Sequence, residues 1–199
     1  MTRAHDAPRP PGRSVPLDHF VGMYEAKTDP WDNATKWSDQ RKYAVTTASL
    51  TRERYRRCYE PGCAVGLLTR LLAPRCDEIL AVDAVPEAVR TAAAAVRDFP
   101  HVTVQRAVLP ADLPGGTFDL IVVGDLLYYL SAGDLDELLT GLIERLEPDG
   151  ELVAVHYRDP SGSTYDGAHV HELLRQRLET VIHHDDEWFV LDVLKFRRS

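Results

Sequence analysis

Beyond Thr51 the sequence alternates short apolar, β-branched runs with segments of helical spacing, and no other feature restricts the fold as strongly. Strands are expected at residues 57–60, 79–82, 102–105, 118–123 and 151–156, and helices at 67–72, 86–98, 134–146 and 169–177. This alternation is typical of βαβ units on a parallel sheet. Two later strands, near Val181 and at 188–196, are joined by a turn too short for a crossover, so they must pair antiparallel.

The strand at 57–60 has the weakest pattern of the set. Arg56 and Arg57 are polar for a strand that would be buried at the centre of a sheet. Its assignment therefore depends on the glycine-containing turn that follows it.

The first fifty residues follow a different pattern. Residues 1–16 are rich in proline and arginine and are expected to form a flexible tail. Helices are expected from Leu17 to about 28 and from about 34 to 50. In the second helix the spacing predicts one shared face, made of Trp37, Arg41, Ala44, Val45 and Ala48. We expect one domain over 17–199, with 17–50 as a helical lid and 51–199 as the core.

Composition excludes several classes of protein. The 199 residues contain 23 lysines and arginines against 31 aspartates and glutamates, a net charge of −8, whereas a nucleic-acid binder would normally be basic. No apolar run approaches the roughly 20 residues of a membrane span, and the N-terminus lacks the apolar stretch of a secretory signal. A cytoplasmic protein is expected. Three cysteines without a CxxC pair predict neither a disulfide framework nor a metal site.

Residues 60–66, Glu-Pro-Gly-Cys-Ala-Val-Gly, lie between a strand and a helix. A turn with glycines at a helix N-terminus brings backbone N–H groups close to a ligand, although a tight turn can also need glycine for its dihedral angles alone. Ala64 and Leu67 stand where a dinucleotide-binding loop has its second and third glycines. The turn therefore suits a ligand without phosphates, such as a nucleoside that carries an amino acid.

Asp83 ends the strand at 79–82 and follows Gly66 by 17 positions. An acidic residue at about this distance binds ribose hydroxyls in nucleotide-binding βαβ units. The alternative role is an N-cap for the helix that begins near Pro86. The glycine-containing turn upstream favours the ribose role.

Three further candidates follow buried strands at the carboxyl edge of the sheet, where open α/β folds bind ligands. Asp125 and Tyr128 come after the strand at 118–123, together with Tyr129, which is expected mainly to pack. His156 ends the strand at 151–156 and could accept a proton. A lone histidine at a strand end is more often structural.

Together these motifs resemble the class I S-adenosylmethionine-dependent methyltransferases, and more closely the NodS group of small N-methyltransferases. The segments that carry the likeness are Asp29-Pro30-Trp31, Trp37 with Arg41-Lys42-Tyr43, Glu60-Pro61-Gly62-Cys63, Tyr128-Tyr129-Leu130 and His156-Tyr157-Arg158. The resemblance implies an α/β, Rossmann-like fold with a mostly parallel seven-stranded sheet in the order 3-2-1-4-5-7-6. Helices would cover both faces, and the N-terminal helices would form a lid over the site.

The resemblance also implies S-adenosyl-L-methionine as the cofactor. Its binding residues would be Trp31, Trp37, Arg41, Glu60, Gly62, Cys63, Gly66 and Asp83. Arg41 would pair with the cofactor's carboxylate, and a lid aromatic would flank the sulfonium. Asp125, Tyr128 and His156 would serve catalysis, with Asp125 and His156 positioning and deprotonating the acceptor.

The implied activity is N-methylation of an amino sugar or another small polar amine in a biosynthetic pathway. Two alternatives stay open at this point: an O-methyltransferase of secondary metabolism on the same fold, and a non-catalytic module that binds S-adenosylmethionine. The expected partner is a small-molecule acceptor, without nucleic acid or membrane. The oligomeric state and the acceptor are not fixed by the sequence.

Overall fold

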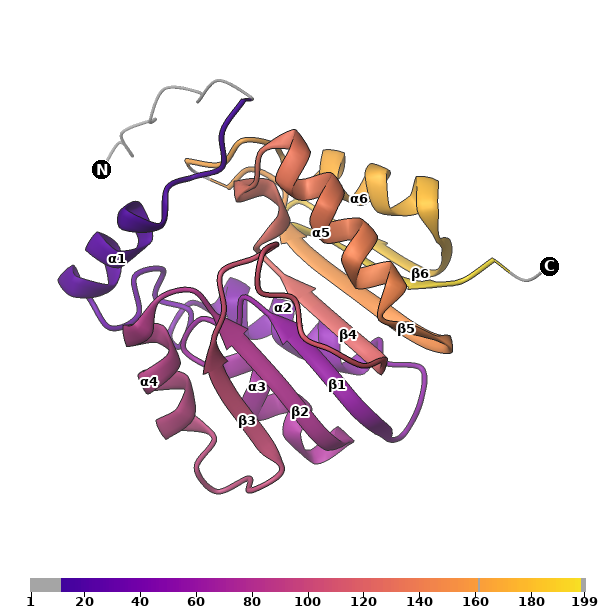
Figure 1. The fold of residues 1–199 in the computed structure, drawn as a ribbon, viewed down its shortest axis with the longest axis horizontal. Coiled ribbons are helices and arrows are strands. Elements are labelled where there is room, and N and C mark those ends of the chain that lie inside the picture. The colour runs from indigo at the N-terminus through magenta and orange to yellow at the C-terminus, as the bar shows by residue number, and fades with distance from the viewer. Residues whose placement is uncertain (1–11, 161, 198–199) are drawn as a thin grey trace.

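The computed structural model describes residues 12–160 and 162–197, which form a seven-stranded sheet in the order β3-β2-β1-β4-β5-β7-β6 (Figure 1). The strands are β1 Tyr55–Pro61, β2 Cys76–Asp83, β3 Val102–Arg106, β4 Phe118–Gly124, β5 Leu146–Tyr157, β6 Glu179–Asp185 and β7 Phe189–Lys195. The first five strands are parallel, whereas β7 pairs antiparallel with both β5 and β6. The expected strand order and the antiparallel final pair are confirmed.

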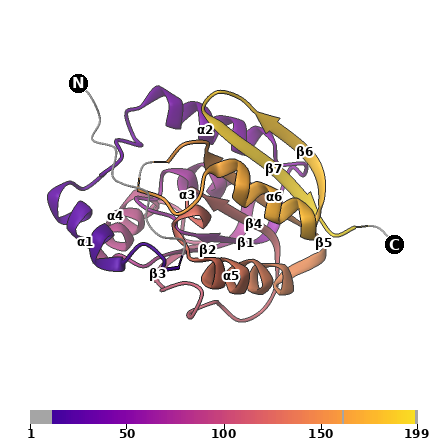
Figure 2. The same cartoon turned by 90° about the horizontal axis from the view of Figure 1, so that it is seen from above.

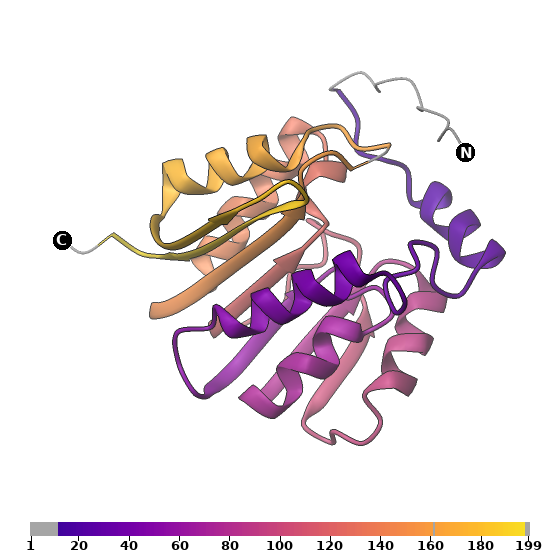
Figure 3. The same cartoon turned by 180° about the vertical axis from the view of Figure 1, so that it is seen from behind.

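Helices cover both faces of this sheet (Figure 2, Figure 3). They are α1 Leu17–Ala26, α2 Trp37–Ala48, α3 Leu67–Leu72, α4 Pro86–Ala95, α5 Ala132–Glu144 and α6 Gly167–Arg177, with short 3₁₀ turns η1 Ala73–Arg75 and η2 Leu127–Tyr129. Helices α2, α3 and α4 lie on one face, and α5 and α6 on the other. In the part of the chain that the structure describes, no helix is long and apolar enough to cross a bilayer.

The buried run of β4 supplies both halves of the core, because successive side chains of a strand point to opposite faces. Leu120 and Val122 join the cluster beneath α2 and α3. Ile121 and Val123 join the cluster beneath α5 and α6. A strand buried on both faces reads as a continuous apolar run, which explains why this element was predictable.

The polar start of β1 has a specific anchor. Arg56 and Arg57 are exposed, and their backbone N–H groups donate to the two carboxylate oxygens of Asp119, at 2.9 and 2.7 Å. The following residues, Cys58 and Tyr59, pair with β4 in the regular register. The strand assignment is confirmed, and its first residues tolerate charge because they lie at the end of the sheet.

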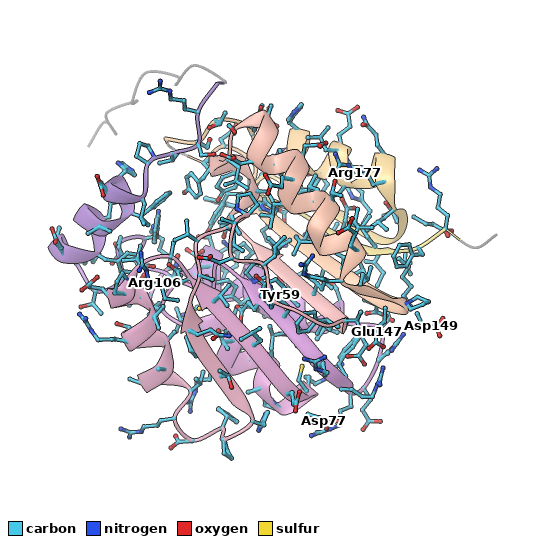
Figure 4. All side chains as sticks on the ribbon, viewed as in Figure 1. Tyr59, Asp77, Arg106, Glu147, Asp149 and Arg177 are labelled. Carbon is cyan, nitrogen blue, oxygen red and sulfur yellow. The ribbon has the colours of Figure 1, made fainter. Side chains whose placement is uncertain are left out.

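The amino ends of the strands form one edge of the sheet and the carboxyl ends the other, and Figure 4 labels residues at both. Asp77 and Glu147 lie at the amino edge, where they pair with arginines of the β1 region. Arg106 ends β3 at the carboxyl edge and donates to the carbonyl of Ala84 at 3.1 Å. The pocket described below opens at this carboxyl edge.

The N-terminal segment departs from the expectation of a free tail over 1–16. Val15 is buried, and its N–H donates to the carbonyl of Tyr129 at 2.7 Å. The hydroxyl of Ser14 accepts from the N–H of Ser131 at 2.7 Å and donates to Asp134. Residues 14 and 15 are therefore packed against the segment after β4, whereas Pro16 is exposed. Residues 1–11 of the expected tail lie outside the described residues.

Helix α2 turns a different face to the protein than the spacing of its larger residues indicates. Trp37 is 67% exposed, and Ala44 and Ala48 are also exposed. The buried residues of this helix are Asp39, Lys42 and Thr46. The predicted apolar stripe is wrong because this helix presents polar groups to the carboxyl end of the sheet.

Candidate active site

A pocket of about 1170 Å³ lies at the carboxyl ends of β1, β2 and β4. Helix α1 and the segments that follow β3 and β5 complete its wall. Seven of the residues predicted for the site line this pocket: Trp31, Glu60, Gly62, Cys63, Asp83, Asp125 and Tyr128.

The turn after β1 has the conformation that its glycines permit. Gly62, Ala64 and Gly66 all have positive φ, at 75°, 49° and 80°. A Cβ on Gly66 would lie 2.9 Å from the Cα of Ala92 in α4, so only glycine fits there. Gly66 does not line the pocket; it allows the turn to pack on α4 while Gly62 and Cys63 face the cavity.

Asp83 fixes this turn from the neighbouring strand. Its Oδ2 accepts from the N–H of Ala64 and its Oδ1 from the N–H of Val85, both at 3.0 Å. Burial raises the pKa of Asp83. The N-cap of α4 is Val85 rather than Asp83, so the capping alternative does not describe the geometry. Each carboxylate oxygen keeps a second lone pair for a ligand.

Glu60 is buried beside Asp83, and burial raises its pKa to about 8. Its Oε2 is shielded from solvent and has no hydrogen-bond partner. A buried carboxylate without a partner is costly unless a ligand supplies a donor. Glu60 therefore suits a cationic group in the pocket.

Aromatic side chains of the N-terminal region form the opposite wall. The rings of Tyr24 and Trp31 meet edge to face with centroids 5.7 Å apart, and Phe20 contacts Tyr129 at 5.1 Å. The Tyr24 hydroxyl is buried without a partner. Helix α1 packs on Val65, which belongs to the turn after β1, and on Val85 and Ala88 at the start of α4.

Asp125 occupies the far end of the pocket, with its backbone at φ 50°. Its Oδ1 accepts from the Tyr128 hydroxyl and from the Tyr157 N–H, both at 2.9 Å. Burial, and next the Asp125 charge, raise the pKa of Tyr128. Tyr128 thus stays protonated and donates to Asp125.

Sequence analysis missed two residues of this end. Lys42 is buried and its ammonium contacts Asp125 Oδ2 and, at 3.0 Å, Asp39 Oδ1. Asp39 itself lines the pocket. A lysine and an aspartate three positions apart in a helix share a face, but that spacing alone does not distinguish a buried pair from an exposed one.

His156 lies outside the pocket, buried within the core. Its Nε2 accepts from the Leu127 N–H at 3.3 Å, and its Nδ1 contacts His171 Nε2 at 3.2 Å. The other nitrogen of His171 contacts Asp192 at 2.7 Å. Burial lowers the pKa of His156 well below its ordinary value. The structure does not bring His156 and Asp125 to one shared opening, so this histidine is not placed to accept a proton from a ligand in the pocket.

Trp37 and Arg41 also lie outside the pocket lining. The Arg41 guanidinium pairs with Asp186 Oδ2 at 2.5 Å and lies 5.1 Å from the ring centroid of Phe189. It therefore ties α2 to the β6–β7 hairpin. Its expected contact with a cofactor carboxylate is not part of this geometry.

The chain is similar to known proteins over most of its length. The family model for nodulation protein S (NodS) matches residues 23–189. Nodulation protein S of Rhizobium tropici is 32% identical over 77% of this chain and 68% of that protein. The Bradyrhizobium diazoefficiens protein of the same name is 30% identical over 67% of this chain. That match spans 65% of the relative, just under two thirds of its length.

Solved structures agree with this result. A Pseudomonas syringae chain described as a candidate methyltransferase is 41% identical, with a TM-score of 0.72 over 80% of this chain and 99% of that one. N-methyltransferase NodS from Bradyrhizobium japonicum, in complex with S-adenosyl-L-homocysteine, has a TM-score of 0.82 at 23% identity, over 90% of this chain and 98% of that one. This last likeness concerns the fold. Together with the family model, the comparisons place the chain: it belongs to the NodS family.

Proposed function

We propose that the protein transfers a methyl group from S-adenosyl-L-methionine to the amine nitrogen of a small polar acceptor, of which an amino sugar is the type we favour. Membership of the NodS family supports the reaction type. The acidic side chains that line the pocket support an amine as the acceptor. Both the activity and the acceptor class are proposals for this chain.

The residues of the β1–β2 end fit the cofactor. Glu60 has an unpartnered buried oxygen suited to an ammonium, Asp83 has spare lone pairs for ribose hydroxyls, and Trp31 with Tyr24 offers aromatic surface. Gly62 lets the chain approach a ligand closely. When bound, the cofactor supplies a methyl group made electrophilic by a sulfonium.

One observation carries the choice of an amine: most of the charged side chains that line the pocket are carboxylates. Of the described residues that line it, seven are acidic: Asp39, Glu60, Asp83, Asp125, Asp134, Asp159 and Glu187. Lys36 is the one lysine or arginine among them, and its ammonium donates to the Trp31 carbonyl. Such a cavity attracts cations. An alkyl amine with a pKa of about 10 reaches the site as an ammonium.

Asp125 is the residue that we assign to this ammonium. Its side chain keeps 26% of its surface exposed while Tyr128 and Tyr157 hold it from behind. A carboxylate so fixed can accept a hydrogen bond from the nitrogen, orient its lone pair after deprotonation and receive the proton. Tyr128 acts by keeping Asp125 in place. Helix α1 contributes Leu17, Phe20 and Met23 to the pocket wall, which places apolar surface beside the reacting groups.

The test uses methyl-¹³C S-adenosyl-L-methionine with matched acceptors that differ in one group, such as glucosamine and glucose, or an alkyl amine and its alcohol. Mass spectrometry and NMR identify the methylated atom. We expect transfer to nitrogen only, and loss of transfer in Asp125→Asn. Transfer to the alcohols would favour an O-methyltransferase. Tight binding of S-adenosyl-L-homocysteine without any transfer across the panel would favour a binding module.

The location and partners remain part of this proposal. The three cysteines are free thiols, which suits the reducing cytoplasm. A small molecule is the expected partner, since the acidic pocket and the net charge of −8 disfavour nucleic acid.

A further inference from the structure

Lys42 has no exposed side-chain surface, although lysine is rarely buried completely. Its ammonium lies 3.0 Å from Asp39 Oδ1, contacts Asp125 Oδ2 and lies 3.9 Å from the ring centroid of Tyr157. An ammonium has three N–H donors. The hydrogen bond to Asp125 uses one of them, whereas Asp39 contributes an ion pair without hydrogen-bond geometry and Tyr157 an aromatic face.

Stability alone does not explain this arrangement. Taking an ammonium and its carboxylates out of water costs several kcal/mol per ion, and apolar residues of similar volume are often as stabilising or more so. Helix α2 could have packed on the sheet with leucine or methionine at position 42. A buried pair in contact with a ligand pocket is a reason to look for a role in the site.

Asp125 depends on neighbouring residues to hold its backbone conformation and its carboxylate in place. Its φ of 50° places a non-glycine residue in the left-handed region, which costs about 1–3 kcal/mol unless the surroundings fix it. Tyr128 and Tyr157 hold Oδ1, and Lys42 is the contact on Oδ2. The three donors come from η2, β5 and α2. Only the Lys42 contact carries charge.

We infer that Lys42 is a positioning residue: it fixes Oδ2 of Asp125 towards the acceptor and separates this carboxylate from that of Asp39. The inference rests on the proposed methyl transfer for its kinetic arm. Without the ammonium, two neighbouring carboxylates would repel each other, and Asp125 would keep its bonds to Oδ1 alone. With it, the cluster carries one uncompensated negative charge, which faces the pocket through Asp125.

The primary variant is Lys42→Met, with Lys195→Met as the matched control. Lys195 also pairs with a buried carboxylate, Glu151 Oε1 at 2.9 Å, among residues at the opposite edge of the sheet. Crystal structures of both variants with S-adenosyl-L-homocysteine show where Asp125 lies. Calorimetry gives the affinity for that ligand, and kinetics use whichever amine of the panel the wild type methylates fastest.

For Lys42→Met we expect a displaced Asp125 carboxylate, a kcat lower by about tenfold or more, no rise in the KM of the amine and a ligand affinity within about twofold of wild type. Lys195→Met should match the wild type in the position of Asp125, in kcat, in the KM of the amine and in ligand affinity. Asp125 in its wild-type position, or a kcat within about twofold of wild type, overturns the inference. So does a general loss of ligand affinity, which a merely structural lysine would cause.

Asp39→Asn gives a second measurement should Lys42→Met fail to fold. It leaves Lys42 paired with Asp125 alone, which neutralises the cluster. We expect the KM of the amine to rise about fivefold or more with kcat nearly unchanged; unchanged constants would contradict the inference. If the wild type methylates no amine, the proposed function fails, while the crystal structures still decide whether Lys42 positions Asp125.

Discussion

Lys42, which is fully buried, forms an ion pair with the partly exposed Asp125 although 83 positions separate them in the sequence. The lysine comes from the N-terminal helix α2 and the aspartate from the turn after β4. Helix α2 is thereby tied to the carboxyl end of the sheet, where the pocket lies. We therefore expect α2 to act as a fixed wall of the site, and α1 to be the part of the N-terminal region that moves when a ligand binds.

Asp125→Asn should lower kcat/KM for the amine by about a hundredfold or more, which corresponds to about 2.7 kcal/mol. The amide cannot bind an ammonium as a carboxylate does, and it must turn its NH₂ group towards a donor. Affinity for S-adenosyl-L-homocysteine should change less than about threefold. Asp77→Asn, which removes an exposed carboxylate at the amino edge, is the control. Equal kinetics for the two variants would remove Asp125 from the reaction.

Glu60 should release a proton when the site takes up a cationic group. Its pKa of about 8 means that much of Glu60 is protonated at pH 7. A bound ammonium favours the ionised form, so the proton leaves on binding. Titration calorimetry of S-adenosyl-L-homocysteine in buffers of different ionisation enthalpy measures this release. Glu60→Gln should abolish it and bind more weakly; the same proton release in the variant would assign it to another group.

The raised pKa of Glu60 also predicts how the stability of the folded protein depends on pH. The folded protein holds the Glu60 proton more tightly than the unfolded chain does, so the ligand-free protein loses stability as the pH rises from about 4.5 to about 8. Each unit is worth about 1.4 kcal/mol. Glu60→Gln should therefore unfold at higher temperature than wild type at pH 8 and at a similar temperature at pH 5. An equal difference at both pH values would contradict the raised pKa.

Asp83→Ala should weaken binding of S-adenosyl-L-homocysteine by about 1.5–3 kcal/mol, because hydroxyls of the ligand lose a charged acceptor. The melting temperature should fall modestly as well, since Asp83 also accepts from Ala64 and Val85. Asp98→Ala changes an exposed carboxylate just beyond α4 and serves as the control. Normal affinity together with a large loss of stability would restrict Asp83 to holding the turn.

The fold was predictable because local patterns carry it. The run 120–123 is apolar throughout, and the turn after Glu60 has its glycines where positive φ is needed. The site was predictable only where a motif marks it, as at Glu60, Gly62 and Asp83. Asp39 lies in no such motif, and Lys42 lies in a segment of the family resemblance that assigns it no role. Polar residues on a helix ordinarily face water. Arg41 finds Asp186 at a separation of 145 positions, which no local spacing encodes.

Hydrogen exchange should separate the two N-terminal helices. Amides of α1 should gain protection when S-adenosyl-L-homocysteine binds, because α1 forms the pocket wall and has Tyr24 as its one buried residue. Amides of α2 should change little, since Lys42 and Arg41 already fix this helix to Asp125 and Asp186. Equal gains in both helices would mean that α2 also closes on the ligand.

His156→Phe should lower stability without moving the acidic limb of the pH–rate profile. The Leu127 N–H can only donate, so His156 Nε2 accepts, and the neutral ring then donates from Nδ1 to His171. Phenylalanine leaves that buried N–H unpaired, at a cost of about 1–3 kcal/mol. The pH dependence of stability follows from the same burial. Because burial lowers the pKa of His156 and His171, the unfolded chain takes up protons near pH 6.5 that the folded chain does not. The free energy of unfolding of the wild type should therefore decrease as the pH falls below about 6.5. In the variant it should decrease less steeply, and the two slopes should differ by up to about 1.4 kcal/mol per pH unit. Urea unfolding at pH 5, 6 and 7 measures these slopes, and a shifted rate profile at unchanged stability would return His156 to the reaction.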